Sequence, residues 1–359
     1  MRTESHVPAA GPSDGVGSGT RALELSPQSS RSVGAVQNSP QMLDAADMSA
    51  ARFGVQRARV RDALSLAYVR EGAGGYPLLL IHGWPETKRI WWRNIGPLAA
   101  AGFEVIAPDL RGFGDSDLAT DDHYDLATHA RDLYALVHDV LGHERCAAVA
   151  GDLGGAIVPD LALRFPGFVE RICLFNTVTP FLPQDYDAAG LDNDLPREAR
   201  LAADYFVRQS TDADNLAAEL DTPARRVRYI GDFYGHRLWT VPRAFAAEDV
   251  TFMSEPFADA GKFRASIANY EYATGRRTPA EPPLFFEKVQ VPTLILYGPG
   301  DHVVPADFPR RAAIAYPEHI GPFVVADAGH FLQWEQPEIL NQALRYFLAD
   351  RMALSRSRA

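Results

Sequence analysis

The sequence contains few cysteines and no long apolar run. Its only two cysteines, Cys146 and Cys173, lie in apolar, strand-like stretches, where small buried thiols are expected rather than a disulfide. No stretch of about 18 consecutive apolar residues is present, and the first 25 residues lack the apolar core of a secretory signal. These absences argue against a disulfide-stabilised secreted domain and a membrane partner, and they favour a cytoplasmic location.

Basic residues are fewer than acidic ones. The chain has 35 Lys and Arg against 46 Asp and Glu, a net charge of −11 with histidine neutral. Nucleic acids and anionic membranes require a clustered basic surface, whereas the pairs Arg225-Arg226 and Arg276-Arg277 stand alone. We therefore expect neither nucleic acid nor membrane as a partner. A length of 359 residues is enough for one large α/β domain with an insertion.

The chain divides into segments of different composition. Residues 1–50 contain no aromatic residue and are rich in Ser, Gly, Pro, Ala and Gln, which predicts a disordered segment. In residues 51–176 and 291–359, strand-like and helix-like runs alternate, and we assign both to one core domain. Residues 177–290 are rich in aromatic residues and helical patches and are too long for an ordinary loop. We predict that they form a helical cap over the carboxyl ends of the strands.

Apolar runs of strand length recur along the core segments, mostly without the alternation of a half-exposed strand. Such runs are typical of strands buried on both faces. Between them, segment 128–141 places Leu133, Leu136 and Val137 on one helical face. Alternating strands and helices predict the α/β class with a doubly wound, mostly parallel sheet. The expected strands are Gln56–Val60, Leu64–Arg70, Pro77–Ile81, Phe103–Ala107, Cys146–Ala150, Ile172–Phe175, Thr293–Tyr297 and Gly321–Val325.

The pentapeptide Gly151-Asp152-Leu153-Gly154-Gly155 directly follows the apolar run at residues 146–150. A strand that turns sharply into a helix lifts one side chain out of the backbone, and small neighbours allow the strand and helix to pack closely. Here the lifted side chain is the carboxylate of Asp152. A carboxylate can displace a leaving group from saturated carbon and form an ester. The alternative role for an aspartate at this place is to cap the helix.

A second motif, His82-Gly83-Trp84-Pro85-Glu86, follows the expected strand Pro77–Ile81. As a functional loop, it would direct the backbone N–H of Trp84, together with that of Leu153, at a developing negative oxygen. The structural alternative is a Gly/Pro turn with a tryptophan in the core. Pro85 has no backbone N–H and a fixed φ, which favours a tight loop in either case.

Two further candidates follow later strands. Asp301 comes just after the strand Thr293–Tyr297, and His330 comes after the last expected strand. A carboxylate can hold an imidazole in one tautomer and stabilise its cation, although turn aspartates and loop histidines often have no such role. The order Asp152, Asp301, His330 matches the order of nucleophile, acid and histidine in hydrolases with a strand-to-helix elbow.

Together these motifs resemble the α/β-hydrolase family, and within it the branch with an aspartate nucleophile, which contains epoxide hydrolases and haloalkane dehalogenases. The resemblance extends from Ala51 to Ala349. It implies an α/β-hydrolase core with an inserted helical cap. It also implies that Asp152 is the nucleophile, that His330 activates water, that Asp301 orients the histidine, and that the N–H groups of Trp84 and Leu153 form the oxyanion hole.

Resemblance to the epoxide hydrolases implies two acids in the cap, usually tyrosines. An alkoxide leaving group is strongly basic and needs a proton donor, whereas halide departs without one. The segment Ser266–Tyr272 resembles the tyrosine-bearing helix of these enzymes, with Tyr270 as the first candidate and Tyr272 next to it. Tyr205 resembles the second acid. Trp84 and Tyr272 are expected to contact the substrate.

The residue after the proposed nucleophile bears on the choice between epoxide and halide. Haloalkane dehalogenases usually carry a tryptophan there to hold the halide, and haloacid-acting relatives place arginines nearby. This chain has Leu153 and Ala156, neither of which offers a side-chain donor, although Trp84 could supply one. The resemblance thus favours epoxide opening. Two alternatives stay open, a haloalkane dehalogenase with the same triad and a ligand-binding member without turnover.

The expected reaction opens an epoxide to a vicinal diol through an ester on Asp152, which is then hydrolysed by water that His330 and Asp301 activate. No metal or organic cofactor is expected, and the sequence has no metal-ligand spacing such as His-Glu-x-x-His. The expected partners are a small apolar epoxide, or an alkyl halide, and water. The sequence leaves a homo-oligomer open.

Overall fold

The computed structural model describes residues 49–61, 63–191 and 204–356. The chain divides into two units, Met1–Gln41 and Met42–Ala359, and all described residues belong to the second. The predicted disordered segment 1–50 therefore lies outside the described residues, except for its last two positions.

Within the described residues, eight strands form one sheet in the order β1-β2-β4-β3-β5-β6-β7-β8. β1 pairs antiparallel with β2, and β2 pairs antiparallel with β4. The remaining neighbours, from β4 to β8 in the sheet order, pair parallel. This confirms the predicted doubly wound, mostly parallel α/β sheet. The strands are β1 (Val55–Arg61), β2 (Leu64–Glu71), β3 (Tyr76–Ile81), β4 (Phe103–Pro108), β5 (Cys146–Ala150), β6 (Val169–Phe175), β7 (Thr293–Tyr297) and β8 (His319–Val324).

Burial explains the apolar runs. Every residue of β4, β5 and β7 is buried, because helices cover the central strands, and β5 and β7 have the predicted bounds. β8 begins two residues earlier than predicted and ends one residue earlier. It is an edge strand, and Ile320, Phe323 and Val324 are exposed on it, so its apolar residues do not mark a fully buried strand.

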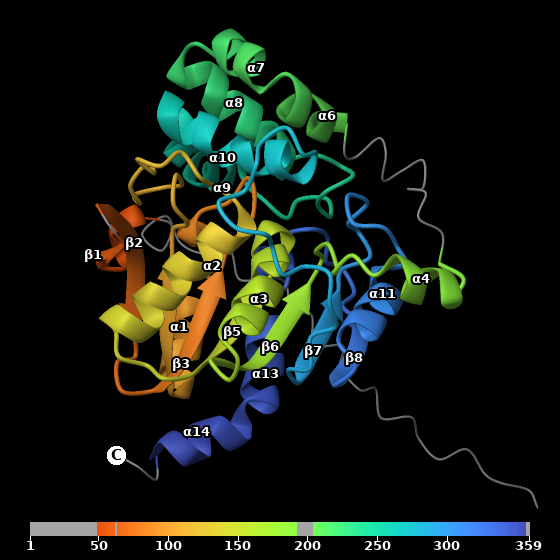
Figure 1. Ribbon diagram of the computed structural model, residues 1–359. Coiled ribbons are helices and arrows are strands. Elements are labelled where there is room, and N and C mark those ends of the chain that lie inside the picture. The colour runs from red at the N-terminus through yellow and green to blue at the C-terminus, as the bar shows by residue number, and fades with distance from the viewer. Residues whose placement is uncertain (1–48, 62, 192–203, 357–359) are drawn as a thin grey trace, which may run out of the picture. The chain divides into compact units, whose positions relative to one another are not determined.

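Helices cover both faces of the sheet. Figure 1 shows α2, α3 and α11 in front of the strands and α13 behind them. The helix expected at 128–141 begins at Leu126, after the capping side chain of Asp125, and widens into a π-helix beyond Tyr134. The helical elements of the core are η1 (Ala50–Arg52), η2 (Lys88–Trp91), α1 (Ile95–Ala101), α2 (Leu126–Tyr134), η3 (Ala135–Val140), α3 (Asp152–Arg164), α11 (Phe308–Ala315), α12 (Leu332–Glu335), α13 (Pro337–Phe347) and α14 (Ala349–Arg356).

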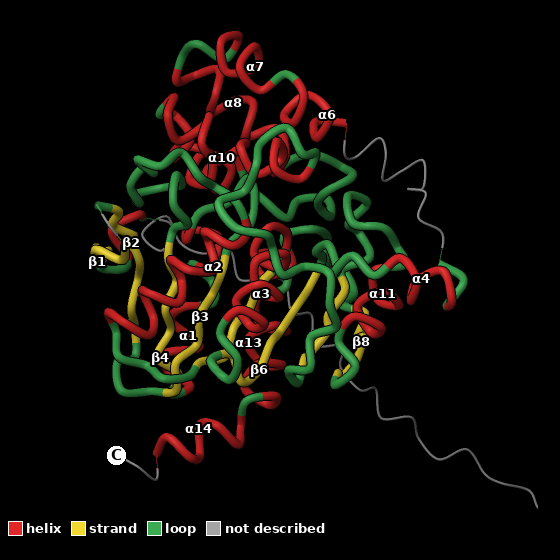
Figure 2. The backbone as a smooth tube through the Cα atoms, in the orientation of Figure 1, coloured by secondary structure: helices red, strands yellow, loops and turns green. Residues whose placement is uncertain are grey.

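The described residues between β6 and β7 contain helices and loops but no strand, as Figure 2 shows. In Figure 1, α6 to α10 gather beyond the carboxyl ends of the parallel strands. None of the described helices is long and apolar enough to span a membrane. The elements of this segment are α4 (Pro183–Ala188), α6 (Asp204–Thr211), α7 (Ala213–Glu219), α8 (Pro223–Tyr234), α9 (Ala247–Ser254), η4 (Glu255–Ala258) and α10 (Ala260–Ala273).

Candidate active site

Asp152 stands at a sharp turn between β5 and α3. Its φ of 44° lies in the left-handed region, which non-glycine residues rarely adopt. Two glycines make room for the turn: a Cβ on Gly83 would lie 2.5 Å from the Asp152 side chain, and one on Gly154 would lie 2.6 Å from the carbonyl oxygen of Ile81. The small residues of the motif are therefore required by close packing, and the Asp152 carboxylate is lifted out of the backbone.

The loop after β3 contacts this carboxylate directly. The backbone N–H of Trp84 donates to Asp152 Oδ1 at 2.6 Å. Leu153 lies in the first turn of α3, where a backbone N–H has no acceptor within the helix. The loop itself is fixed by His82, whose Nε2 accepts from the Leu110 N–H at 2.9 Å. Burial lowers the pKa of His82 to about 4, so this histidine is neutral and structural.

His330 lies between two carboxylates. Its Nδ1 is 2.9 Å from Asp301 Oδ2, and its Nε2 is 3.3 Å from Asp152 Oδ2. Asp301 also accepts the backbone N–H of Val303 at 2.7 Å and the side-chain amide of Asn176 at 3.0 Å. These bonds fix the acid, which in turn orients the imidazole. The structure thus brings the three predicted triad residues together at the carboxyl ends of β5, β7 and β8.

Burial differs sharply within this group. The side chains of His330 and Asp301 are fully buried, whereas 18% of the Asp152 side chain is exposed. Burial lowers the pKa of His330, but the nearby carboxylates of Asp301 and Asp152 outweigh it, and the pKa lies well above its ordinary value. The imidazole is therefore protonated at neutral pH.

Tyr205 on α6 and Tyr270 on α10 lie over the elbow. Tyr205 stacks on Trp84 with ring centroids 5.2 Å apart, and Tyr270 meets the same indole edge-on at 5.5 Å. The two tyrosine rings also meet each other edge-on, with centroids 5.6 Å apart. Burial and the charge of Asp152 raise the pKa of both tyrosines, so both keep their protons at neutral pH. The side chain of Asp259 accepts the Lys262 N–H at 2.9 Å and fixes the start of α10.

The structure places Tyr272 away from this group. Its hydroxyl lies 3.3 Å from the carbonyl oxygen of Asp122 and 3.3 Å from His123 Nδ1. Two residues along a helix correspond to a rotation of about 200°, so Tyr270 and Tyr272 point to different sides of α10. The expectation that Tyr272 contacts the substrate therefore gains no support from the structure.

Comparisons with known proteins identify the family to which this fold belongs. The family model described as alpha/beta hydrolase fold matches residues 76–337. The chain belongs to the α/β-hydrolase family. A soluble epoxide hydrolase of Corynebacterium sp. (strain C12) is 29% identical over 285 residues, 78% of this chain and 92% of that protein. The solved structure of the epoxide hydrolase CorEH without ligand has a TM-score of 0.71 at 24% identity and covers 83% of this chain and 99% of its own.

A relative with a different name shows how far the similarity reaches. The 2-hydroxy-6-oxononadienedioate/2-hydroxy-6-oxononatrienedioate hydrolase 2 of Pseudomonas putida is 27% identical over 325 residues, 85% of this chain and 99% of that protein. Hydrolases named for different substrates thus match this α/β-hydrolase at similar identity. The choice of substrate must come from its own side chains.

Two residues beside Asp152, Asp301 and His330 escaped the sequence interpretation. Asn176, directly after β6, binds Asp301 and both polar backbone groups of Gly298. Glu86 is buried, accepts the Gly83 N–H at 2.5 Å and the Gln333 amide at 2.7 Å, and has its pKa raised to about 7 by burial and by the charge of Asp152. Because Glu86 is the last residue of the motif His82–Glu86, its place in the sequence could have predicted that it lies near Asp152.

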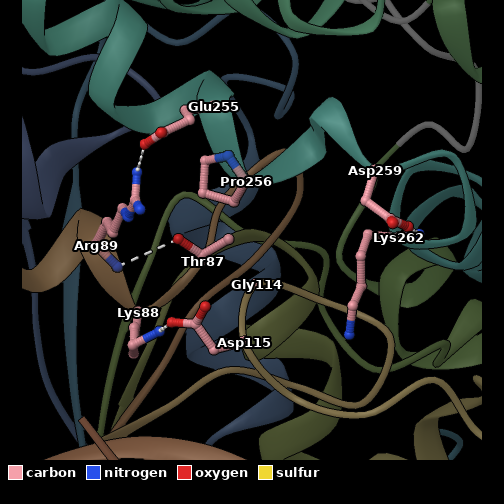
Figure 3. Close-up of a pocket in the computed structure, with 9 residues that line it drawn as sticks. All are labelled: Thr87, Lys88, Arg89, Gly114, Asp115, Glu255, Pro256, Asp259 and Lys262. Carbon is pink, nitrogen blue, oxygen red and sulfur yellow. Dashed lines mark hydrogen bonds and ion pairs between the residues drawn. The ribbon is translucent and has the colours of Figure 1, made fainter. Parts of the chain in front are cut away.

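A polar cavity of about 280 Å³ lies near the start of α10, and its lining contains none of Asp152, Asp301 and His330. Figure 3 shows Lys88 directed at Asp115 and Arg89 directed at Glu255 across its wall. Lys262 donates to the backbone carbonyl of Ser116. The charged groups of this cavity thus already have partners. It is lined by Thr87, Lys88, Arg89, Gly114, Asp115, Glu255, Pro256, Asp259 and Lys262.

Among the described residues, no group of three or more His, Cys, Asp and Glu side chains is arranged to hold a metal ion. Cys146 and Cys173 are both buried and unbonded to each other, and burial raises the pKa of each thiol.

Proposed function

We propose that this hydrolase opens an epoxide to a vicinal diol through a covalent ester on Asp152. The observation that carries the proposal is a partly exposed carboxylate that lies 3.3 Å from a histidine and is bound by the N–H of Trp84, the residue whose indole both tyrosines contact. A carboxylate is suited to attack on saturated carbon. The tyrosines supply the protons that a strongly basic alkoxide requires.

In the first step, Asp152 attacks an epoxide carbon, and the bond between that carbon and the ring oxygen breaks. Tyr270 and Tyr205 donate hydrogen bonds to the oxygen as it takes up the electron pair, and one of them passes its proton to that oxygen and is left as a phenolate. Their raised pKa values keep both phenols protonated beforehand. The product of this step is a hydroxyalkyl ester of Asp152.

In the second step, the charge balance around His330 changes. Ester formation removes the negative charge of Asp152, one of the two carboxylates that raise the pKa of the histidine, so the imidazole can give up its proton, which returns through solvent to the phenolate left by the first step. With Asp301 orienting it, His330 then takes a proton from water, which attacks the ester carbonyl. The N–H groups of Trp84 and Leu153 hold the oxyanion. As the bond between the carbonyl carbon and the diol oxygen breaks, that oxygen takes the proton of His330, and the Asp152 acid then passes its own proton to the imidazole, which restores the carboxylate.

The structure also weighs against halide chemistry. Leu153 offers no side-chain donor, and Trp84 was the remaining candidate to hold a halide. The indole N–H of Trp84 instead donates to Ser266 Oγ on α10 at 3.3 Å. A halide would have to displace that bond, whereas the rings of Tyr205 and Tyr270 pack on the same indole with their hydroxyls protonated. This contact favours an epoxide over an alkyl halide as substrate.

The test uses His330→Gln, which should form the ester but hydrolyse it slowly. The variant is mixed separately with epoxides and with haloalkanes of matched carbon skeleton, and the intact mass of the protein is measured. Addition of the whole epoxide mass, absent in the double variant with Asp152→Ala, is the expected result. A haloalkane adduct without the halide would instead indicate dehalogenation. Folded protein without any adduct would contradict the covalent mechanism and favour a ligand-binding member of the family.

A further inference from the structure

Glu335, at the end of α12, is a buried carboxylate that contacts no member of the triad through its side chain. Its oxygens accept three backbone N–H groups: Oε2 accepts those of Gly329 and Val241, and Oε1 accepts that of Phe331, each at 3.0 Å. Only 5% of the residue is exposed. Three donors converge on one acidic side chain in the interior.

Two of these donors are the residues immediately before and after His330. Glu335 thus holds the backbone on both sides of the histidine, and the histidine N–H donates to the Trp239 carbonyl oxygen at 2.6 Å. A Cβ on Gly329 would lie 2.5 Å from that same oxygen and 3.0 Å from Glu335 Oε1. The segment 329–331 has no spare room, so its position depends on these bonds.

The third donor connects the histidine loop to another part of the chain. Val241 belongs to the loop between α8 and α9, as does Trp239, whose ring meets the His330 ring edge-on with centroids 4.7 Å apart. His302, beside the proposed acid, donates its N–H to the Leu238 carbonyl oxygen of the same loop at 2.9 Å. Glu335 therefore ties together the histidine loop and the loop that covers the imidazole.

A carboxylate suits this place better than its amide. An ionised glutamate accepts on both oxygens and donates nothing, which matches three converging donors. A glutamine in the same place would turn an NH2 group toward at least one backbone N–H and leave that donor unpaired. Burial raises the pKa of Glu335 to about 7, and the three N–H groups act in the opposite direction because they favour the ionised form.

We propose that Glu335 is a positioning residue that holds the His330 imidazole in place for hydrolysis of the Asp152 ester. The proposal rests on the function proposed above. Asp152 itself is held by other groups, since Trp84 N–H binds its carboxylate and its own N–H donates to the Asn176 carbonyl oxygen at 3.1 Å. Loss of the Glu335 contacts therefore slows the second step and spares the first.

The experiment compares Glu335→Gln with the unmodified protein in single-turnover mixing, with intact mass as the readout. The panel of epoxides begins with styrene oxide, and the member that labels His330→Gln is used. We expect the Glu335→Gln ester to form within about twofold of the normal rate but to decay about 10- to 100-fold more slowly, as expected for a misplacement of about 1 Å. In steady state, kcat and KM then fall together while kcat/KM changes little.

Glu338→Gln is the matched control. It makes the same chemical change three residues away, on an exposed side chain, and should alter neither step. Should circular dichroism show that Glu335→Gln does not fold, Glu335→Asp replaces it. That variant keeps the charge but retracts it by one methylene, and slower ester decay is again expected.

Two results would overturn the positioning role. One is normal ester decay in a folded Glu335 variant, and the other is equal slowing of ester formation and ester decay, which indicates general damage. These outcomes are distinct from failure of the proposed function. If His330→Gln forms no ester with any epoxide, the function and the positioning role both fail. If that variant labels normally and Glu335→Gln hydrolyses normally, only the positioning role fails.

Discussion

Two groups of buried charges lie near the same edge of the sheet but differ in how completely they are paired. In one, Asp109 accepts the Lys88 N–H at 2.8 Å, the Lys88 ammonium at 2.5 Å and the Asp115 N–H at 2.7 Å, and Lys88 also binds Asp115. In the other, Asp152 Oδ1 receives one N–H, and Oδ2 lies 3.3 Å from His330.

The difference sets a structural carboxylate apart from the one proposed to react. Asp109 is completely buried, its oxygens are enclosed by donors, and the charge of Lys88 helps to lower its pKa against the effect of burial. Asp152 is partly exposed, and its second oxygen has a neighbour only at the long end of hydrogen-bond distance. Residue type does not distinguish the two roles, whereas partial exposure and an incompletely enclosed oxygen do.

The largest expected effect comes from removing the open carboxylate. Asp152→Ala should lower diol release by about 10⁴-fold or more, because no other carboxylate stands at the elbow to form the ester. Its free energy of unfolding should change by less than about 1 kcal/mol, since few contacts are lost. Product analysis and urea unfolding measure the two quantities. If Asp152→Ala instead lost much of its stability and kept turnover, Asp152 would be a structural carboxylate like Asp109.

The converse change removes the cation of the enclosed group. Lys88→Met leaves Asp109 as a buried charge without its cation, and such a change costs about 3–5 kcal/mol of unfolding free energy. Turnover per folded molecule should fall far less than in Asp152→Ala. Urea unfolding followed by circular dichroism gives the stability. An unfolding free energy equal to that of the unmodified protein would show that the Lys88 ion pairs contribute nothing.

The two tyrosines of α10 sharpen the comparison on the side of the reactive group. Tyr270→Phe removes a hydroxyl near Asp152 and should slow ester formation about 100-fold. Tyr272→Phe makes the same change on the other side of the helix and should alter the rate by less than about twofold. Rapid mixing with mass detection compares the pair. Equal effects would remove the assignment of Tyr270 as a proton donor.

The smallest effect concerns another enclosed carboxylate, Glu104 on β4. It accepts from Arg70 at 2.7 Å, the Gly74 N–H at 2.8 Å and His143 at 2.7 Å, and these bonds outweigh burial and lower its pKa to about 2. Because the folded pKa lies below the unfolded value of 4.5, its contribution is complete above pH 4.5 and is lost as the pH falls toward 2.

Glu104→Gln should therefore destabilise the protein by about 2 kcal/mol at pH 7. The difference between variant and unmodified protein should shrink below pH 4.5, where the unfolded glutamate becomes protonated. Urea titrations at several pH values give the free energies. A difference that stays constant with pH would mean that the charge of Glu104 makes no net contribution.

Much of the sheet could be predicted because its strands are buried on both faces and their apolar runs are unambiguous. β5 and β7 have the predicted bounds, and the elbow after β5 follows from the small residues around Asp152. The bounds of the edge strand β8 were predicted less well, because several of its apolar residues are exposed and apolar character does not indicate burial there. The division into core and cap remains a prediction.

The residues that could not be predicted act through contacts between distant segments. Asn176 joins the end of β6 to Gly298, more than a hundred positions away, and Glu335 reaches Val241. No local pattern marks such partners. The helix face of Tyr270 was also uncertain, because one or two residues of register decide whether a side chain of α10 turns toward Asp152 or toward Asp122.

The aromatic surroundings of the elbow provide an optical signal for its chemistry. The backbone N–H of Trp84 donates to the Asp152 carboxylate, and the Trp239 ring contacts that of His330. Neutralising Asp152 as an ester changes the electric field at these two indoles. Intrinsic fluorescence should therefore follow ester formation and decay in real time without any added label.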